Sequence, residues 1–455
     1  MKPPIRGTLA LLVVAIGLRA AAVVQWSSEG PGWHSNLLVD TDSYLRLAVN
    51  LSQSGVYGFE DTTGRVTPSA FRPPLYPWLL SWLQSGPSIN LAWVATLNVV
   101  FGVAAVWLTW SIGCHIGLKW AWLAGLAVAV DPILLRASQS AMTETLAATL
   151  ALAVWRTWLV FGTAARNSAC KAQSLSPAVL PLASVGIGTL FGLAILARPT
   201  AAPWALLSVG AMLVVGSSCW KRRCFHVLIA STCIAVCVVP WTIRNWTQIG
   251  KPIWATSHGG YTLLLANNPL LFQHFAFNGP SRNWDAEPFH AVWATRAGEN
   301  YEVASPEFWE QQIETLETSS QSDGLTETQD DELAYRAAKA TIARQPVMFG
   351  LSSLYRACWF WAWWPNQSNF VVKLGIGAWY AAWFFAAIGG LSRVLAGREV
   401  VKWLPALLLV VTLSGIHSIY WSNMRMRAPV VAGVYLLGVG ALGRQLTTTD
   451  RESTL

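Results

Sequence analysis

Long apolar segments recur along the whole chain and restrict its fold more than any other feature. A helix of ~20 apolar residues crosses the ~30 Å hydrocarbon core of a bilayer. Charged residues make up only 12% of the 455 residues, about half their share in soluble proteins. The sequence therefore predicts an all-α polytopic membrane protein with about ten transmembrane helices: 8–26, 91–112, 120–135, 144–161, 178–196, 201–215, 227–239, 370–391, 404–420 and 429–442.

Lysine and arginine residues set the expected orientation of these helices. They concentrate in alternate short loops, for example at Lys119, at Arg166 and at 221–223, and such loops face the cytoplasm under the positive-inside rule. Both ends of the chain are then expected in the cytoplasm. The tryptophan-rich stretch 347–364 is expected to be an exported interfacial or re-entrant helix, because a further span there would place the basic loop after 391 outside. Since the net charge of +8 is not pooled on one polar domain, no nucleic acid partner is expected.

The pattern divides the chain into three expected parts. Residues 1–243 form an N-terminal transmembrane module whose first exported loop, 27–90, contains amphipathic helices at 43–54 and 76–83. Residues 244–346 form an exported polar domain, which contains 13 of the 23 acidic residues. In this domain, Ser305 and Pro306 mark the start of a helix. A second helix is expected at 330–344, with acidic residues in its first turn. Residues 347–455 hold the interfacial helix and the last transmembrane helices.

With this topology, polar residues next to the spans gather on the exported face. Guanidinium groups match phosphate oxygens well. Carboxylates beside them can act as a general base on a hydroxyl or hold a divalent cation together with a phosphate. This chemistry suits group transfer from a lipid phosphate to a hydroxyl. The residues are Asp40, Asp42, Arg72, Asp131, Glu144, Arg198, Arg244, Arg425 and Arg427.

An ordered set of short motifs around these residues resembles the GT-C glycosyltransferases. The nearest group is the bacterial relatives of protein O-mannosyltransferases and of the lipid A aminoarabinose transferase. The chain departs from that group in having Thr41 after Asp40, where Glu is frequent, and Met426 in the late Arg-x-Arg motif, where Tyr is common. The matching stretches are 40–44, Ala48, 50–51, Gly55, 70–77, 142–144, 192–194, 198–200, 240–241, 244–245, 259–261, 267–269, 425–427 and Pro429.

The resemblance implies an inverting transferase that takes a sugar from a polyprenyl-phosphate carrier on the exported face of a bacterial inner membrane. The acid of the family that lies four positions before a Tyr corresponds to Asp40, the expected general base. Asp42 and Glu144 complete the expected catalytic set. Arg72, Arg198, Arg244, Arg425 and Arg427 are the expected ligands of the donor phosphate, and Tyr44, Tyr76, Asn245 and His258 are expected to contact substrate.

Each of these residues also has a structural interpretation. Asp40 could cap the helix at 43–54, and Asp42 could cap it, orient Asp40 or help to bind a divalent cation. Glu144 could simply complement the dipole of its helix. The arginines could anchor lipid headgroups, and His258 could be a structural histidine.

The alternative function is a transporter or flippase of lipid-linked sugars. Such a protein would show ionisable residues at mid-span, broken helices or internal repeats, whereas the charges here cluster at one face. The expected partners of the transferase are a polyprenyl-phosphate-sugar donor, membrane lipid, and a protein, lipid or glycan acceptor. A divalent cation at Asp40 and Asp42 is a possible cofactor.

Overall fold

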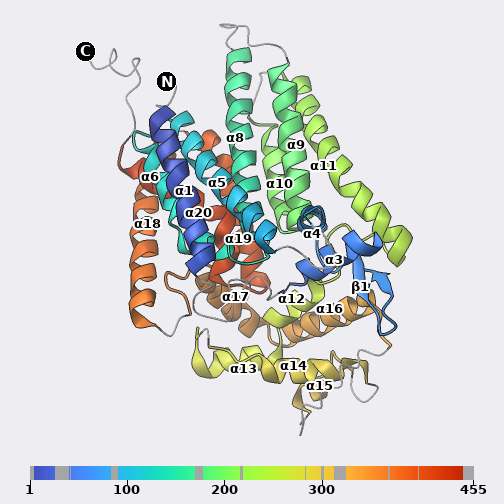
Figure 1. Ribbon diagram of the computed structural model, residues 1–455. Helices are drawn as coiled ribbons and strands as arrows, with labels where there is room; N and C mark the ends of the chain where they lie inside the picture. Colours follow the sequence, from blue (N-terminus) through green and yellow to red (C-terminus); the bar gives the residue numbers. More distant parts are fainter. Residues whose placement is uncertain are drawn as a thin grey trace, which may run out of the picture.

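The fold is a bundle of long helices with a layer of short elements at one end (Figure 1). The computed structural model describes residues 5–25, 40, 42–83, 91–169, 178–215, 219–281, 283–298, 302–311, 324–366, 369–397 and 399–443. Parts of the expected first exported loop, 26–39, 41 and 84–90, lie outside the described residues. The bundle consists of α1 (Ile5–Gln25), α5 (Leu91–His115), α6 (Ala121–Ala129), α7 (Pro132–Ala137), α8 (Glu144–Ala169), α9 (Val179–Ala197), α10 (Ala201–Ala211), α11 (Trp220–Ile249), α18 (Phe370–Ala396), α19 (Val400–Ile419) and α20 (Ala428–Ala441).

Six of the helices in the described part of the chain are long and apolar enough to cross a membrane: α5, α8, α9, α11, α18 and α19. Among the remaining expected spans, 8–26 and 429–442 correspond to the helices α1 and α20, whereas α10 ends before the expected 215 and the span at 120–135 is interrupted. The predicted span 120–135 is two helices, because Asp131 and Pro132 start α7 and the Asp131 carboxylate accepts the Leu134 N–H at 2.7 Å. Neither α6, with 9 residues, nor α7, with 6, is long enough to cross a bilayer core alone. The α20 helix has 14 residues and is buried along almost its whole length.

The first loop folds at the end of the bundle where α8 begins. It contains α3 (Tyr44–Ser54), the antiparallel strands β1 (Gly58–Glu60) and β2 (Val66–Pro68), and α4 (Leu75–Ser81). The two amphipathic helices were predicted at almost these positions. The hairpin was not, and it is a small exception to the all-α prediction. Gly55 ends α3 with a positive φ of 70°, a conformation that glycine adopts without steric cost.

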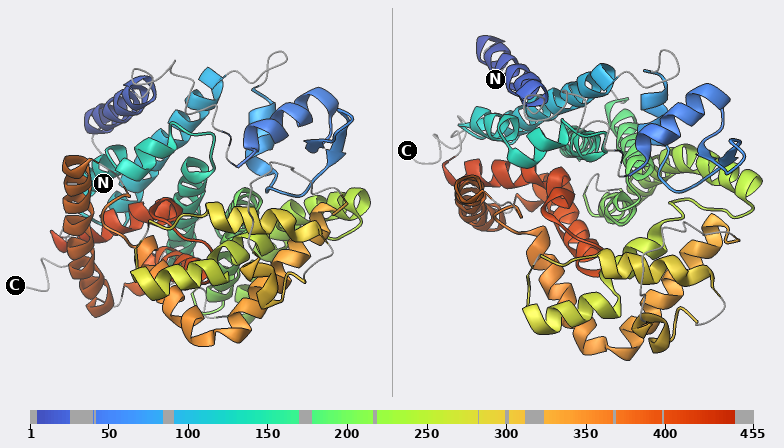
Figure 2. Two further views of the ribbon diagram at one scale, coloured as in Figure 1. Left: turned by 90° about the horizontal axis from the view of Figure 1, so that it is seen from below. Right: turned by 60° about the horizontal axis from the view of Figure 1, so that its bottom comes forward.

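The polar region forms the rest of this layer and has an apolar core of its own, which includes Leu264, Phe289, Phe308 and Ala337. Figure 2 shows from below that its helices lie beside the first loop. Ser305 caps α15 as predicted. The second predicted helix begins at Glu327, earlier than expected, because Thr326 and Gln329 form a capping box. The elements are α12 (Gly259–Ala266), α13 (Pro269–Asn278), α14 (Glu287–Ala294), η1 (Thr295–Ala297), α15 (Pro306–Glu310) and α16 (Glu327–Arg344).

Helix α17 (Pro346–Phe360) joins the polar region to the bundle through one buried arginine. The Arg356 guanidinium donates to the Ser418 carbonyl at 2.9 Å, to the Ala266 carbonyl at 2.5 Å and to Asn267 Oδ1 at 3.1 Å. Ala266 and Asn267 lie at the end of α12, and Ser418 lies in the last turn of α19. Because a buried guanidinium needs all its donors satisfied, Arg356 fixes the polar region on the bundle. The stretch 347–364 is thus a short helix at this end, as predicted, although its position relative to a membrane stays a prediction.

The Asp331 carboxylate gives a pH-dependent test of this layer. It accepts the Gly260 N–H at 2.6 Å, and burial raises its pKa from 3.8 to about 6. A carboxyl group with a raised pKa stabilises the folded state below about pH 4 and loses that contribution as the pH rises through about 6. We therefore expect Asp331→Asn, which still accepts from Gly260 but has no charge to desolvate, to increase the free energy of unfolding at pH 8 by about 1–2 kcal/mol.

The measurement is the thermal unfolding midpoint in one detergent from pH 4 to pH 8. The two proteins should unfold at the same temperature near pH 4, separate between pH 4 and about 6, and differ by a constant amount above that pH. Parallel curves over the whole range would show that Asp331 does not titrate in the folded state.

Candidate functional site

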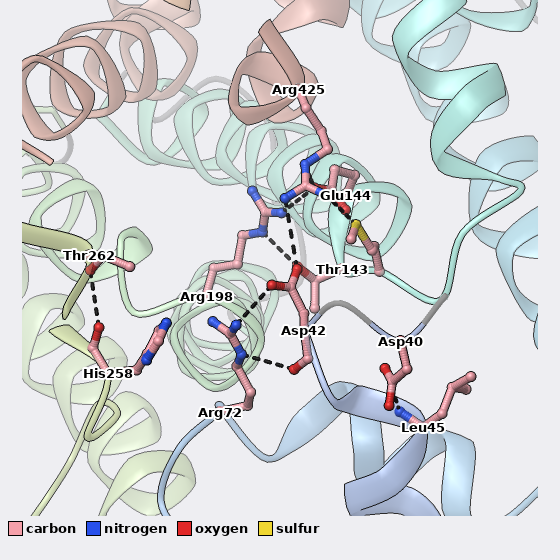
Figure 3. Close-up of polar contacts among 11 residues, drawn as sticks. Asp40, Asp42, Leu45, Arg72, Thr143, Glu144, Arg198, His258, Thr262 and Arg425 are labelled. Carbon is pink, nitrogen blue, oxygen red and sulfur yellow. Dashed lines mark hydrogen bonds and ion pairs between the residues drawn. The ribbon is translucent and has the colours of Figure 1, made fainter. Parts of the chain in front are cut away.

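Five charged side chains from four distant segments meet where the first loop contacts the bundle (Figure 3). We name Asp42, Arg72, Glu144, Arg198 and Arg425 the charge cluster. Arg72 Nη2 lies 2.8 Å from Asp42 Oδ1, and Arg198 Nη2 lies 2.8 Å from Glu144 Oε1. Arg425 joins the two pairs, since its Nε is 3.1 Å from Glu144 and its Nη2 is 3.8 Å from Asp42. Two acids and three arginines that were predicted separately therefore form one network.

Glu144 is the centre of the charge cluster. It is the first residue of α8, and its side chain is only 1% exposed. Arg198 reaches it because Pro199 ends α9: the residue before a proline is pushed out of the helical conformation, and Arg198 has an extended backbone at φ −149° and ψ 114°. Arg198 Nε also donates to Thr143 Oγ1 at 2.7 Å. A buried carboxylate is stabilised only by such close opposite charges.

Arg425 and Arg427, which were predicted together as phosphate ligands, point in different directions. Both belong to the 3-10 turn η2 (Met424–Arg427), where residues two apart lie on different sides. Arg425 enters the charge cluster. The Arg427 guanidinium is 1% exposed, donates to the Phe360 carbonyl at 3.1 Å and lies 4.3 Å over the Tyr380 ring. The structure does not bring Arg427 to the charge cluster, because it is buried among α17 and α18.

Tyr44 lies beneath the charge cluster at the start of α3. Its ring packs edge-on against Tyr76 with 5.5 Å between centroids, and Arg72 Cζ is 5.9 Å from its centroid. Burial raises the pKa of the Tyr44 hydroxyl. Tyr76 is fully buried, and its hydroxyl donates to Asn98 Oδ1 at 3.2 Å. Tyr44 thus borders the charge cluster, whereas Tyr76 supports it from within the core.

Asp40 lies beside the charge cluster but points away from it (Figure 3). Its carboxylate accepts the backbone N–H groups of Leu45 at 3.1 Å and Arg46 at 2.9 Å. The structural interpretation of Asp40 as a helix cap is therefore observed. No described residue forms an ion pair with Asp40, in contrast to Asp42 and Glu144. Its role as a general base stays a prediction.

The residues present do not fit a divalent cation at Asp40 and Asp42. The Asp42 oxygens face two guanidinium groups, and both Asp40 oxygens accept from backbone amides. A cation site needs several free oxygen ligands. The described residues contain no group of three or more His, Cys, Asp or Glu side chains that could hold a metal ion.

Arg244 and Asn245 hold the backbone of the first loop from the end of α11. Arg244 Nη1 donates to the Ser69 carbonyl at 2.7 Å and to Asn245 Oδ1 at 2.9 Å, and Asn245 Nδ2 donates to the Ile253 carbonyl at 2.7 Å. The structure therefore places both residues outside the charge cluster. Their donors are used by carbonyl groups, so neither is aligned on an anion.

His258 lies across from the charge cluster, near Arg72 (Figure 3). Its ring is 4.3 Å from that of Phe71 and stacks on that of Tyr261 at 4.9 Å. Burial and, to a smaller extent, the charge of Arg72 lower the pKa of His258 to about 3. The imidazole is neutral at physiological pH and can accept or donate a hydrogen bond, but it carries no charge for a phosphate.

Sequence analysis missed two further contributors to the site. Thr143 lies in a motif that was recognised, but its hydroxyl was not assigned to Arg198. Glu327 accepts hydrogen bonds from the first loop, at Ser69 Oγ and at the Ala70 N–H. No local signal identifies Glu327, because Ser69 and Ala70 lie more than 250 residues away along the chain and its third partner, Ser257, lies 70 residues away.

The charge cluster carries one net positive charge when its three guanidinium groups and two carboxylates are ionised. Arg425 is 37% exposed, and Arg72 and Arg198 are partly exposed. Guanidinium groups held in place by carboxylates are preorganised, because little side-chain entropy remains to be lost when an anion binds. The arrangement suits an anion with several oxygens, such as a phosphate.

Removing the Glu144 charge tests this geometry. Glu144→Gln keeps the shape but leaves Arg198 and Arg425 without their shared counter-charge, so we expect a loss of about 1–3 kcal/mol in the free energy of unfolding. The matched control is Glu399→Gln, which removes the carboxylate of the Lys402–Glu399 pair at 3.0 Å. A partly exposed pair of that kind contributes only ~0–1 kcal/mol. Equal unfolding midpoints for the two variants would contradict the geometry.

Comparison with known proteins gives the fold. No family model and no curated protein match the chain. Among solved structures, the archaeal oligosaccharyltransferase AglB from Archaeoglobus fulgidus, in complex with an inhibitory peptide and a dolichol-phosphate, matches 96% of this chain and 50% of its own, at 15% identity and a TM-score of 0.53. Its apo form matches the same shares at 14% identity and a TM-score of 0.51.

The chain thus spans about half the length of the oligosaccharyltransferase. ArnT from Cupriavidus metallidurans, bound to undecaprenyl phosphate, also matches, with 15% identity, 97% of this chain, 78% of its own and a TM-score of 0.37. At these identities the likeness to AglB concerns the fold alone. The chain therefore shares its fold with about half of the oligosaccharyltransferase.

Proposed function

We propose that this protein is a membrane glycosyltransferase that moves a sugar from a polyprenyl-phosphate-linked donor to an acceptor hydroxyl, with inversion at the anomeric carbon. The observation that carries the proposal is the charge cluster, in which guanidinium groups outnumber carboxylates at one end of a helix bundle. The fold and the ordered motifs support it. AglB was solved with a dolichol-phosphate, which is the lipid chemistry that we propose for the donor.

The charge cluster faces the exported side in our proposal, and the chain has about ten spans in an inner membrane. Basic residues gather at the opposite end of the bundle, at Lys119 after α5, Arg166 in α8, 221–223 in α11 and Arg393 in α18. Short basic loops stay in the cytoplasm. We further propose that 1–243, 244–346 and 347–455 are the working parts, with the polar region covering the site from the aqueous side.

In the proposed reaction, Asp40 takes the proton of the acceptor hydroxyl while the oxygen of that hydroxyl attacks the anomeric carbon. The bond from that carbon to the phosphate oxygen breaks, and the electron pair remains on the lipid phosphate. Arg72, Arg198 and Arg425 stabilise the charge that develops there, as preorganised donors do. Asp40 suits the base role better than Asp42 or Glu144, because the oxygens of the latter two face guanidinium groups. Each Asp40 oxygen accepts one backbone N–H and retains a second lone pair for a proton.

The remaining predicted residues take supporting roles in this proposal. Asp42 and Glu144 hold the three arginines in position. Tyr44 forms the floor beneath the donor phosphate, and His258 offers a neutral hydrogen-bonding group toward the acceptor. Arg244 and Arg427 shape the walls of the site through backbone carbonyls. The acceptor is a protein, a lipid or a glycan.

The alternative is a transporter of lipid-linked sugars. It is supported by two ionisable residues in the interior of the bundle. Arg19 donates to Ser138 Oγ at 2.7 Å, and Asp131 accepts from the Tyr380 hydroxyl at 2.9 Å. Ionisable residues inside a bundle often mark a transport path. Here, however, each has protein partners. Vesicles in which a lipid-linked sugar crosses the bilayer without any sugar transfer would favour this alternative.

The proposal predicts separate effects of the base and the arginines. Asp40→Asn should lower sugar transfer in membranes by at least ~100-fold while binding of undecaprenyl phosphate to the purified protein stays within about twofold of wild type. Arg198→Ala should weaken that binding by at least ~10-fold, since charge-assisted hydrogen bonds are lost.

The control is Arg393→Ala, at the far end of the bundle, which should change neither sugar transfer nor the binding of undecaprenyl phosphate. Mass spectrometry of lipids in a deletion strain identifies the donor that accumulates and supplies the substrate for the transfer assay. Wild-type transfer by Asp40→Asn would refute the base assignment, and unchanged binding by Arg198→Ala would refute the donor site.

A further inference from the structure

We propose that Glu327, at the start of α16 in the polar region, is a positioning residue for Arg72 of the charge cluster. The inference rests on the proposed function, because it assigns Arg72 to the donor phosphate. Glu327 lies outside every motif of the resemblance. It holds the short segment that precedes Arg72, although it is about 255 residues away in the chain.

The Glu327 carboxylate is a meeting point of three hydrogen-bond donors. Its Oε1 accepts the Ala70 N–H at 2.9 Å and the hydroxyl of Ser257. Its Oε2 accepts the Ser69 hydroxyl at 2.5 Å. Only an ionised carboxylate can accept all three without presenting a hydrogen of its own. The contacts join α16, the first loop and the loop after α11.

The same segment is held from its other side. Arg244 of α11 donates to the Ser69 carbonyl at 2.7 Å, and the Ser257 N–H donates to the Ala70 carbonyl at 3.0 Å. The Ala70 N–H donates to Glu327, and the Ser69 N–H donates to the Tyr57 carbonyl at 3.0 Å. Arg244 and Ser257 bind the two carbonyls. A loop whose backbone groups are all bound in this way has little freedom.

The fixed segment leads directly to Arg72. The Phe71 ring lies between the His258 ring, at 4.3 Å, and Arg72 Cζ, at 4.7 Å. Tyr57 donates to the Arg72 carbonyl at 2.9 Å. From this position Arg72 Nε donates to the Asp42 carbonyl at 3.0 Å and Nη2 to Asp42 Oδ1 at 2.8 Å. Two residues after the Glu327 contact, the chain thus places a guanidinium in the charge cluster.

Glu327 itself is well placed for this task, because the capping box of Thr326 and Gln329 defines the first turn of α16. The arrangement couples the polar region to the donor site by a path of named hydrogen bonds. A neutral Gln at 327 would keep the shape, but its NH₂ group would take the place of the oxygen that accepts the Ser69 hydroxyl. We expect the segment and Arg72 to shift as a result.

The test uses the full-length protein in one detergent and undecaprenyl phosphate as the probe. Glu327→Gln should weaken binding of the probe by about tenfold, the effect of losing a hydrogen bond to a charged group. The matched control is Glu332→Gln on the same helix, whose side chain is 63% exposed and forms an ion pair with Lys251. That variant should bind like wild type.

A double-mutant cycle separates positioning from a loss of structure. If Glu327 acts through Arg72, Glu327→Gln should weaken binding by less than about twofold once Arg72→Ala is present. Equal losses in both backgrounds would overturn the inference. If Glu327→Gln does not fold, the paired variant Ser69→Ala with Ser257→Ala removes two of the three donors and enters the same cycle.

The outcomes also distinguish this inference from the proposed function. Unchanged binding by Arg72→Ala and Arg198→Ala would refute the donor site, and the role of Glu327 with it. If both of these variants bind weakly while Glu327→Gln and the serine pair bind like wild type, the donor site stands and only the positioning role is overturned.

Discussion

The burial of the Glu144 carboxylate is the constraint on which the site depends. A carboxylate with 1% exposure at a helix start requires cations from elsewhere, because its desolvation is not offset by the helix dipole alone. The chain supplies Arg198 from the end of α9 and Arg425 from the turn before α20. The start of α8, the end of α9 and the start of α20 are thereby held together, and the guanidinium groups remain partly exposed.

Charged side chains also hold the layer of short elements at the end of the bundle in a fixed position. The polar region has its own apolar core, but it meets the bundle through Arg356 and the first loop through Glu327. In each case a charged side chain binds neutral groups, among them a backbone carbonyl or amide, rather than an opposite charge. Such contacts specify the position of the backbone, since a carbonyl or amide has one fixed direction.

The parts of the fold that depend on local signals were predictable from the sequence. Apolar periodicity and length indicated the six long helices, and capping residues such as Ser305 marked starts that the structure has. Five of the polar residues that were predicted to gather at one face form the charge cluster, whereas Asp40, Arg244 and Arg427 lie outside it. The hairpin, the break at Asp131 and the opposite directions of Arg425 and Arg427 were not predicted. Arg356 and Glu327 were missed because their partners are remote in sequence, so no spacing rule reports them.

The hydrogen bonds of Glu327 also bear on how such a chain can change in evolution. Its three donors come from two separate loops, and the acceptor belongs to a third segment. An exchange of residues 244–346 alone would carry Glu327 and Ser257 together but would leave behind the Ser69–Ala70 segment of the first loop. The polar region and the first loop therefore have to match each other at this contact.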